Sequence, residues 1–392
     1  MWNTVRWLVL AGAAAPLAYY AAAIACALVY FSKPNPEAPG FGPPVSVLKP
    51  MRGLNRETYR NLASFCRQQY SRYELLFGVD DARDPAVPII HDLMAEFPDL
   101  PIRLLAGTPA VGSNNKVAKL CRLAGEASYD LLVASDGDIR VPPDYLRRVV
   151  APFADSRVGA VTCLYRGLAE SGLWSQLEDV ALTSSFLPGV LVARKLGVKF
   201  ALGATMGVRR QALAGIGGFE SLADVAADDH ELGNRIAARG SQVELARTVV
   251  ETECGSRSFA EYWQHQLRWA VVTRESQPRG HLGFLFAQGL PWAMAVVALA
   301  PWRISAGFVV AYVALRLGVA FTVAVWGLGD PVVRRKGWLV LLADALGFVV
   351  WLASLGASRV VWQGSVYDVR KGILMPVNIN ERGAGAKPGF HP

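Results

Sequence analysis

The stretch that decides the fold is DLLVASDGDIRV, residues 130–141. Residues 131–134 are short and apolar, which predicts a buried strand, and the chain changes character directly after them. Asp136 and Asp138 flank Gly137, so in an extended chain their carboxylates leave the backbone on the same side and a ligand can approach closely. Two carboxylates at a strand end suit a hard divalent cation that carries a diphosphate, although Asp-Gly-Asp is also a common turn sequence.

Apolar strands and amphipathic helices alternate around this stretch. Strands are expected at residues 45–50 (VSVLKP), 73–79 (YELLFGV) and 102–105, and helices at 56–69, 86–97 and from the VGSNNK motif at 111–116 to residue 123. This rhythm predicts an α/β fold with a mostly parallel sheet and helices on both faces. In such sheets, ligands bind beyond the carboxyl ends of the strands.

A second acidic pair follows a neighbouring strand. Asp80 and Asp81 come directly after residues 73–79, so they are expected on the same rim of the sheet as Asp136 and Asp138. The sequence contains neither a GxGxxG fingerprint nor a GxxxxGK[S/T] loop. This absence argues against a hydride-transfer enzyme and against a P-loop enzyme.

Two further motifs carry charged groups on predicted helices. Asp228 and Asp229 stand where a helix begins, where aspartate also serves as a plain cap, and His230 is open between a site histidine and a surface one. Arg268 beside Trp269 lies on a helix expected at residues 261–270. A guanidinium can bind two phosphate oxygens there, and an amphipathic surface helix is the alternative.

The composition points to a membrane protein. The chain has 392 residues, 52% of them hydrophobic, and a formal net charge of +8. The apolar residues fall in long runs and no basic-aromatic nucleic-acid module is present, so we expect a membrane and a phosphate-bearing ligand as partners, and no nucleic acid. The five cysteines are scattered without a Cys-x-x-Cys pair, which argues for reduced thiols in a cytosolic compartment and against a disulfide framework or a structural zinc site.

The apolar runs divide the chain. We expect an N-terminal transmembrane anchor at 1–33, a Pro-rich linker at 34–44, a globular domain at 45–281, transmembrane or interfacial helices at 282–358 and a polar tail at 359–392, disordered from 383. A cleaved signal peptide is the alternative for the first run, whose length favours a retained anchor. Residues 182–193 are apolar but too short to span, so an interfacial helix and a core helix are both open.

The basic residues favour a cytosolic globular domain. Arg334, Arg335 and Lys336 form a loop expected on the same side. Three complete spans, at 282–301, 304–328 and 338–355, would place the basic tail outside, which fits less well. Pro291 in the first run and Asp344 in the last argue against full spans.

Several of these motifs occur in an order that resembles a known family. They are VLKP at 47–50, GVDDARDP at 78–85, VGSNNK at 111–116, DGDIRV at 136–141, the Asp228-Asp229 pair and the Arg268-Trp269 pair. Together with the membrane segments, they resemble inverting family 2-type glycosyltransferases with a Rossmann-like GT-A fold. The resemblance is strongest to the ceramide glucosyltransferase-like branch that includes bacterial hopanoid glycosyltransferases, and it covers the chain from the anchor to about Trp362.

The resemblance implies a role for each motif. Asp229 would be the general base, with Asp228 beside it, and Arg268 and Trp269 would close over the diphosphate and the acceptor. The nucleotide-sugar would be bound by Asp80, Asp81, Lys116, Asp136 and His265, and Mg²⁺ or Mn²⁺ by Asp136 and Asp138. Two positions depart from the family: Asp228 stands where Glu is common, and His265 stands where Gln or Arg is usual.

The expected function is a single transfer of a hexose or N-acetylhexosamine, with GlcNAc favoured, from a UDP-sugar to a hydroxyl of a membrane lipid. A hopanoid such as bacteriohopanetetrol is favoured over ceramide as the acceptor, and the bacterial inner membrane is the expected location. The alternatives are a processive polysaccharide synthase of the cellulose or hyaluronan type, and a catalytically inactive membrane protein that binds UDP-sugar or lipid.

Overall fold

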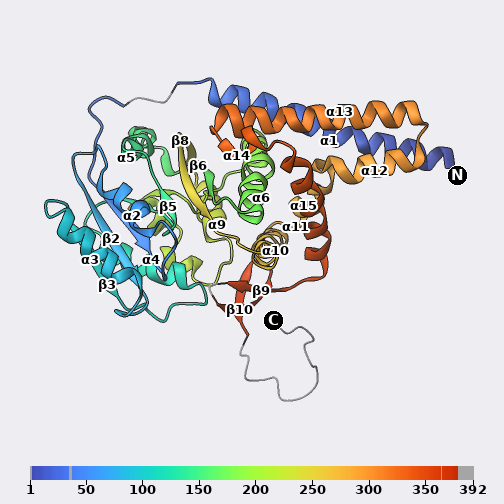
Figure 1. Ribbon diagram of the computed structural model, residues 1–392. Helices are drawn as coiled ribbons and strands as arrows, with labels where there is room; N and C mark the ends of the chain where they lie inside the picture. The colour runs from blue at the N-terminus through green and yellow to red at the C-terminus, as the bar shows by residue number, and fades with distance from the viewer. Residues whose placement is uncertain (1, 35–37, 363, 378–392) are drawn as a thin grey trace, which may run out of the picture.

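An eight-stranded mixed sheet lies at the centre of the computed structural model, which describes residues 2–34, 38–362 and 364–377 (Figure 1). The strand order is β3-β2-β1-β4-β7-β6-β8-β5. The strands are β1 (Val45–Pro50), β2 (Tyr73–Val79), β3 (Ile102–Ala106), β4 (Leu131–Ala134), β5 (Ile139–Arg140), β6 (Val158–Ala169), β7 (Met206–Arg209) and β8 (Gln242–Cys254). Strands β1 to β4 run parallel, and β7 is antiparallel to both β4 and β6. The predicted α/β class with a mostly parallel sheet is confirmed.

Apolar side chains cover both faces of this sheet. Val47 and Leu75 belong to one buried cluster, whereas their neighbours Leu48 and Leu76 belong to the other. This alternation follows from the strand period of two, and burial of both faces explains why these strands read as continuous apolar runs. The covering helices are α2 (Thr58–Cys66), α3 (Ala86–Glu96), α4 (Asn115–Glu126), α5 (Tyr145–Val150), α6 (Leu173–Ala181), α7 (Leu187–Lys195), α8 (Arg210–Gly215), α9 (Asp228–Ala238) and α10 (Phe259–Ser276).

Three helices are long and apolar enough to cross a membrane among the described residues: Asn3–Phe31, Trp302–Gly327 and Leu339–Gly356. They correspond to α1 (Trp2–Phe31), to α13 (Trp302–Ala320) with its π-helical continuation η5 (Phe321–Gly327), and to α15 (Leu339–Gly356). The expectation of apolar helices at both ends of the chain is therefore confirmed.

The apolar run at 282–301 is not one straight helix, as Pro291 led us to expect. The chain there forms α11 (Pro278–Gly283), a short 3₁₀ turn at 284–287 and α12 (Gly289–Leu299), with a bend of 53°. The Tyr20 hydroxyl accepts a hydrogen bond from the Gly289 N–H at 2.8 Å, and a Cβ atom at Gly289 would collide with the Tyr312 ring. Contacts from α1 and α13 therefore stabilise the bend. Pro291 lies in the first turn of α12, where a backbone N–H has no partner within the helix.

The last apolar helix contacts the others but also packs on the globular domain. Helices α1, α12 and α13 lie side by side and extend away from the sheet, whereas α15 packs against α6 and α10 (Figure 1). The segment at 359–376, expected as polar tail, forms a second sheet of β9 (Arg359–Trp362), β10 (Ser365–Arg370) and β11 (Ile373–Pro376). This sheet bonds to the globular domain, because the Leu374 N–H donates to the Asp224 carbonyl oxygen at 2.8 Å. The disorder expected at 383–392 lies outside the described residues.

The basic loop at 334–336 lies on the same side as the sheet. Helix α14 (Pro331–Arg335) is capped by Asp330, and the Lys336 ammonium donates to the side chain of Gln176 on α6 at 2.8 Å. The loop and the second sheet therefore both contact the globular domain.

The apolar segment at 182–193 is a core element. It forms a π-helical turn, η2 (Leu182–Phe186), followed by α7, and its buried side chains pack with α1. Leu182, Leu187 and Leu191 are each at most 5% exposed. Of the two alternatives open for this segment, the structure supports the core helix.

A buried charge network ties the apolar helices to η2. Arg316 on α13 donates to both carboxylate oxygens of Asp344 on α15, at 2.7–2.9 Å, and the Tyr312 hydroxyl donates to the same carboxylate at 2.8 Å. The guanidinium also donates to the Ser184 carbonyl oxygen at 2.8 Å and to the Ser185 hydroxyl at 2.9 Å. Asp344 is therefore the partner of a buried arginine rather than a residue exposed to lipid.

We predict that Asp344→Ala lowers the free energy of unfolding by about 3–5 kcal/mol, because it leaves the Arg316 guanidinium buried without its counter-charge. Thermal unfolding of the protein in detergent measures the effect. The double variant Arg316→Leu with Asp344→Leu should recover much of the loss. Asp155→Ala, which breaks an exposed ion pair with Arg157, is the control and should change little. An Asp344→Ala protein as stable as the parent would contradict the prediction.

Candidate active site

The VGSNNK motif begins helix α4 and organises the rim of the sheet. The Asn114 side chain caps the helix by accepting from the Val117 N–H at 3.2 Å, and it donates to the Val225 carbonyl oxygen at 2.8 Å. Its neighbour Asn115 donates to Asp80 at 2.9 Å. The next residue, Lys116, points to the carboxylates of two other segments. One turn of helix therefore connects three motifs that are far apart in the sequence.

Three aspartates converge on Lys116 and on one glycine. The Lys116 ammonium lies 2.8 Å from Asp136 and 3.3 Å from Asp228. The Gly203 N–H donates to Asp229 at 2.7 Å. A Cβ atom at Gly203 would lie 3.1 Å from an Asp136 oxygen, 3.2 Å from the Lys116 ammonium and 3.4 Å from an Asp229 oxygen. The structure thus brings the end of β4 and the start of α9 together, as the strand-end rule predicts for Asp136.

Burial and mutual repulsion set the charges in this cluster. Burial raises the pKa of Asp228 to about 6 although Lys116 opposes the shift. Burial alone would lower the pKa of Lys116, but Asp136, Asp228 and Asp229 raise it, so the ammonium stays protonated. Asp229 is half-buried and also accepts from the His230 N–H at 2.7 Å, as an aspartate in the first turn of a helix can. The Asp229 carboxylate therefore caps a backbone N–H and still remains accessible.

Asp136 and Asp138 provide the donors that a divalent cation needs. Burial raises the pKa of Asp138, and the charge of Asp136 raises it further, so the two carboxylates lie within electrostatic range. Asp138 also accepts from the Thr252 hydroxyl at 2.7 Å. Within the described residues, no group of three or more His, Cys, Asp and Glu side chains could hold a metal alone. The pair fits Mg²⁺ or Mn²⁺ whose other ligands are diphosphate oxygens and water.

The backbone beside Asp136 is held by a buried lysine. The Lys49 ammonium, at the end of β1, donates to the Asp136 carbonyl oxygen and lies 4.0 Å from the centre of the Phe65 ring. Burial lowers the pKa of Lys49 to about 7, and Asp138 and Asp136 partly oppose that shift. Lys49 therefore supports the acidic turn from beneath.

The first acidic pair divides into a partly buried and an exposed member. Asp80 accepts from Asn115 and from Thr108, and it lies 2.9 Å from the Lys119 ammonium. Burial raises the pKa of Asp80, but these contacts outweigh it and the net shift is downward. Asp81 is exposed and accepts from the Arg83 N–H at 2.8 Å. Both residues follow β2, so they lie on the predicted rim of the sheet. The Asp80 carboxylate is already bonded to Thr108, Asn115 and Lys119.

Helix α10 brings its motif alongside the acidic rim. The His265 ring lies 2.6 Å from Glu178 and packs edge-on against Trp269, with ring centres 5.1 Å apart. Arg268 stacks on Trp362 of the second sheet at 5.7 Å. Burial lowers the pKa of Arg268 to about 10, while Glu178 and Asp136 oppose the shift, so Arg268 and Asp136 are within electrostatic range.

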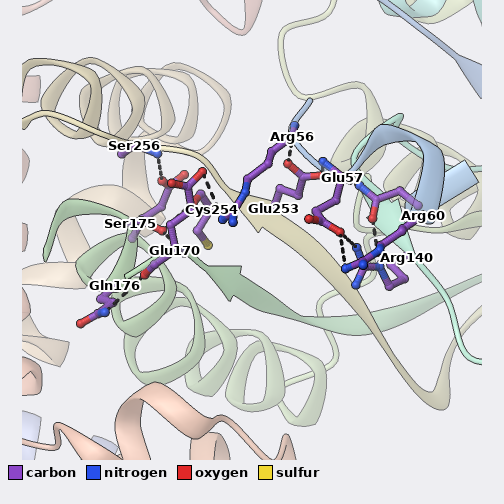
Figure 2. A network of polar contacts seen from close by, with 12 residues as sticks. Arg56, Glu57, Arg60, Arg140, Glu170, Ser175, Gln176, Glu253, Cys254 and Ser256 are labelled. Carbon is purple, nitrogen blue, oxygen red and sulfur yellow. Dashed lines mark hydrogen bonds and ion pairs between the residues drawn. The ribbon is translucent and has the colours of Figure 1, made fainter. Parts of the chain in front are cut away.

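A polar network fixes the strand that follows Asp138 (Figure 2). The Glu253 carboxylate accepts from the backbone N–H groups of Arg56 and Glu57, at 3.2 and 3.0 Å, and Arg140 on β5 forms an ion pair with Glu57 at 3.2 Å. Figure 2 shows these side chains bridging β8 and the segment before α2. The network therefore anchors both β5 and the end of β8, where Thr252 contacts Asp138.

Four residues at the site were not among those predicted: Lys49, Gly203, Glu178 and Thr252. A lysine inside an apolar strand is a signal that the VLKP motif already contained. Gly203, Glu178 and Thr252 carry no local signal, because each acts through a segment distant in the sequence.

The geometry agrees with comparisons to known proteins. A match to the model of Glycosyl transferase family 21 extends over residues 8–375. The chain belongs to this family. The ceramide glucosyltransferase-like resemblance is therefore confirmed. The hopanoid acceptor stays a prediction.

Two curated relatives have names that refer to glycolipid synthesis. The chain is 26% identical over 247 residues to ceramide glucosyltransferase 1 of Caenorhabditis elegans, which covers 63% of this chain and 52% of that protein. It is 28% identical over 204 residues to a beta-monoglucosyldiacylglycerol synthase of Synechocystis, covering 51% and 41%. The chain thus spans about half the length of the curated relatives it matches.

A solved structure supports the GT-A fold. The mannosyltransferase PcManGT from Pyrobaculum calidifontis, in complex with GDP-Man and Mn²⁺, superposes with a TM-score of 0.54 at 20% identity, over 89% of this chain and 99% of that one. At this identity the likeness concerns the fold alone.

We predict that Gly203→Ala lowers transferase activity roughly tenfold or more, because the added methyl forces Lys116, Asp136 and Asp229 apart by a few tenths of an ångström in a site where small displacements are costly. Initial rates on detergent-solubilised protein measure the effect, and the unfolding midpoint should change little. Gly215→Ala, in open space on α8, is the matched control. Equal rates for the two variants would contradict the assignment of Gly203 to the site.

Proposed function

We propose that this family 21 protein is an inverting lipid glycosyltransferase that moves one sugar from a UDP-sugar to a hydroxyl group of a membrane lipid. The convergence of Asp136, Asp229 and Lys116 around Gly203 carries the proposal. The favoured sugar is N-acetylglucosamine, and the favoured acceptor is a hopanoid such as bacteriohopanetetrol, with ceramide second. The proposed location is a bacterial inner membrane, with the site facing the cytosol.

Asp229 is suited to act as the general base. Its carboxylate accepts from the N–H groups of Gly203 and His230, both at 2.7 Å, and these hydrogen bonds fix the orientation of the carboxylate. It remains accessible, whereas Asp228 is 6% exposed. In the proposed reaction Asp229 takes the proton of the acceptor hydroxyl as that oxygen attacks the anomeric carbon. One displacement inverts that carbon and needs no covalent nucleophile.

Two positive groups of the site are placed to receive the leaving UDP. Lys116 and Arg268 both lie within electrostatic range of Asp136, where the diphosphate is proposed to bind. Mg²⁺ or Mn²⁺ held by Asp136 and Asp138 would neutralise the charge that develops on the diphosphate. Asp80 and Asp81, one rim position away, are proposed to contact the uridine.

Aromatic side chains connect the acidic cluster with the apolar helices. Tyr165 packs on Phe186 with ring centres 6.3 Å apart, and Phe186 packs on Trp269 at 5.6 Å. Burial raises the pKa of Tyr165, and the nearby carboxylates of Asp229 and Asp136 raise it further. Phe186 belongs to η2, which Arg316 ties to the membrane helices through Ser184 and Ser185. This apolar route supports a lipid as the acceptor.

We predict that Asp229→Asn lowers the rate by about 10²–10⁴-fold, the usual contribution of a positioned general base. The amide oxygen can still accept one of the two backbone hydrogen bonds, so the fold should remain. Mass spectrometry of total lipids from a host expressing the protein should show a new lipid, heavier by a hexose or an N-acetylhexosamine, that is absent with the variant.

The matched control is Asp224→Asn, which alters an exposed carboxylate that accepts from the Ser113 N–H at 2.8 Å. It should keep the product. If Asp229→Asn makes as much product as the parent, the base assignment is wrong. If the parent adds no sugar to any lipid, the inactive binding protein replaces the enzyme as the better hypothesis.

We also predict a product carrying a single added sugar. Only three long apolar helices are found among the described residues, and α15 packs on the globular domain, which leaves few elements for a polymer channel. Chain-length analysis of the product with excess donor tests this. A ladder of polymer lengths would favour the processive synthase.

A further inference from the structure

A cavity lies away from the acidic cluster, where the ends of α1 and η5 meet the globular domain. Its volume is about 510 Å³, within the range of small-ligand sites, roughly 300–1,000 Å³. Its walls include Tyr30 and Phe31 at the end of α1, and Gly327 and Leu328 where η5 ends. None of the aspartates at the acidic rim lines it. The cavity therefore opens at the level where two spanning helices leave the apolar layer.

The charge of this cavity is opposite to that of the acidic cluster. Five basic side chains line it, against two carboxylates. They are Lys33, Arg140, Arg148, Arg166 and Arg247, with Asp144 and Glu251 as the acids. Arg166 is fixed by Glu251 at 2.7 Å and by the carbonyl oxygens of Leu328 and Gly329, at 2.8 and 2.9 Å. Arg140 and Arg148 are paired with Glu57 and Asp144, so the five basic side chains meet three carboxylates and keep a positive excess.

A β-bulge builds the wall of the cavity next to α1. In the β6–β8 pairing, Cys163 pairs with Ala246 but the next residue pairs with Val249, so Arg247 and Thr248 are inserted into β8. The Tyr30 hydroxyl donates to the Ala246 carbonyl oxygen at 2.8 Å, and the Arg247 guanidinium stacks on the Tyr30 ring at 5.7 Å. Bulges redirect side chains and are frequent beside functional sites. Here the bulge turns a basic residue towards the end of a membrane helix.

A buried hydroxyl in the same wall has no partner in the described parts of the chain. Thr248 is 2% exposed, and its Oγ1 makes no hydrogen bond there. A buried polar group without a partner is unusual in a folded protein and calls for an explanation such as a ligand. Phosphate oxygens accept hydrogen bonds from hydroxyl groups and pair with guanidinium and ammonium groups.

We propose that this cavity binds the phosphate headgroup of an anionic phospholipid. Its position at the ends of α1 and η5 places a headgroup in the cavity while the acyl chains remain beside the helices, and basic pockets at this level suit anionic lipids. A free phosphate has the same recognition chemistry but needs no site at the membrane boundary. The proposal does not depend on the transferase reaction, because no residue of the acidic cluster takes part.

Thermal unfolding of the full-length protein in neutral detergent tests the site, with dioctanoyl phosphatidylglycerol, dioctanoyl phosphatidylcholine, inorganic phosphate and diphosphate as separate probes. We expect phosphatidylglycerol to raise the unfolding midpoint in a saturable way and the other three to have little effect. Lys33→Gln and Arg247→Gln should each weaken the apparent affinity roughly fivefold, the scale of one basic side chain at an anionic membrane surface.

Two variants make the test specific. Thr248→Val keeps the side-chain shape and removes the hydroxyl, so it should weaken the response without unfolding the protein. Arg303→Gln removes an exposed charge at the opposite end of α13 and should leave the response intact. An equal response to phosphatidylcholine, or the same affinity in all four variants, would overturn the proposal. A response to free phosphate as large as that to phosphatidylglycerol would overturn the lipid assignment.

Discussion

The arrangement of the site depends on the Lys116 ammonium, which lies between Asp136 and Asp228. Three carboxylates gathered at one point repel one another, and burial adds a penalty for each charge. Lys116 offsets both effects from a fixed position, because the Asn114 cap sets where α4 begins. The end of β4 and the start of α9 can therefore approach each other closely, and Gly203 leaves the space between them open.

The membrane helices are joined to this site through one irregular turn. This turn is the π-helical segment η2. Its Ser184 and Ser185 contact Arg316, while its Phe186 contacts Trp269. π-Helical turns often occur at functional positions because the extra residue redirects side chains. The same five residues therefore present polar groups to Arg316 of α13 and an aromatic ring to Trp269, which is proposed to close over the acceptor.

The parts of the fold that depend on local pattern could be predicted from the sequence. Asp80 and Asp136 follow apolar strands, and parallel strands end at one edge, so their shared rim was predictable. The broken helix at 278–299 was not, because the break depends on Tyr20 and Tyr312 from other helices. The second sheet was missed for a similar reason, since β11 is held by Asp224 and residues around it rather than by a strong strand pattern.

The net charge of +8 is not spread evenly over the molecule. Carboxylates collect at the rim where β4 ends, whereas basic side chains collect beside the ends of α1 and η5. Strand β8 reaches both regions: Thr252 contacts Asp138, and the bulge at Arg247 and Thr248 forms the wall of the basic cavity. Two regions of opposite charge on one molecule can each attract a different partner. The lipid headgroup proposed at the helix ends and the metal and diphosphate proposed at the acidic rim would therefore occupy separate regions that strand β8 joins.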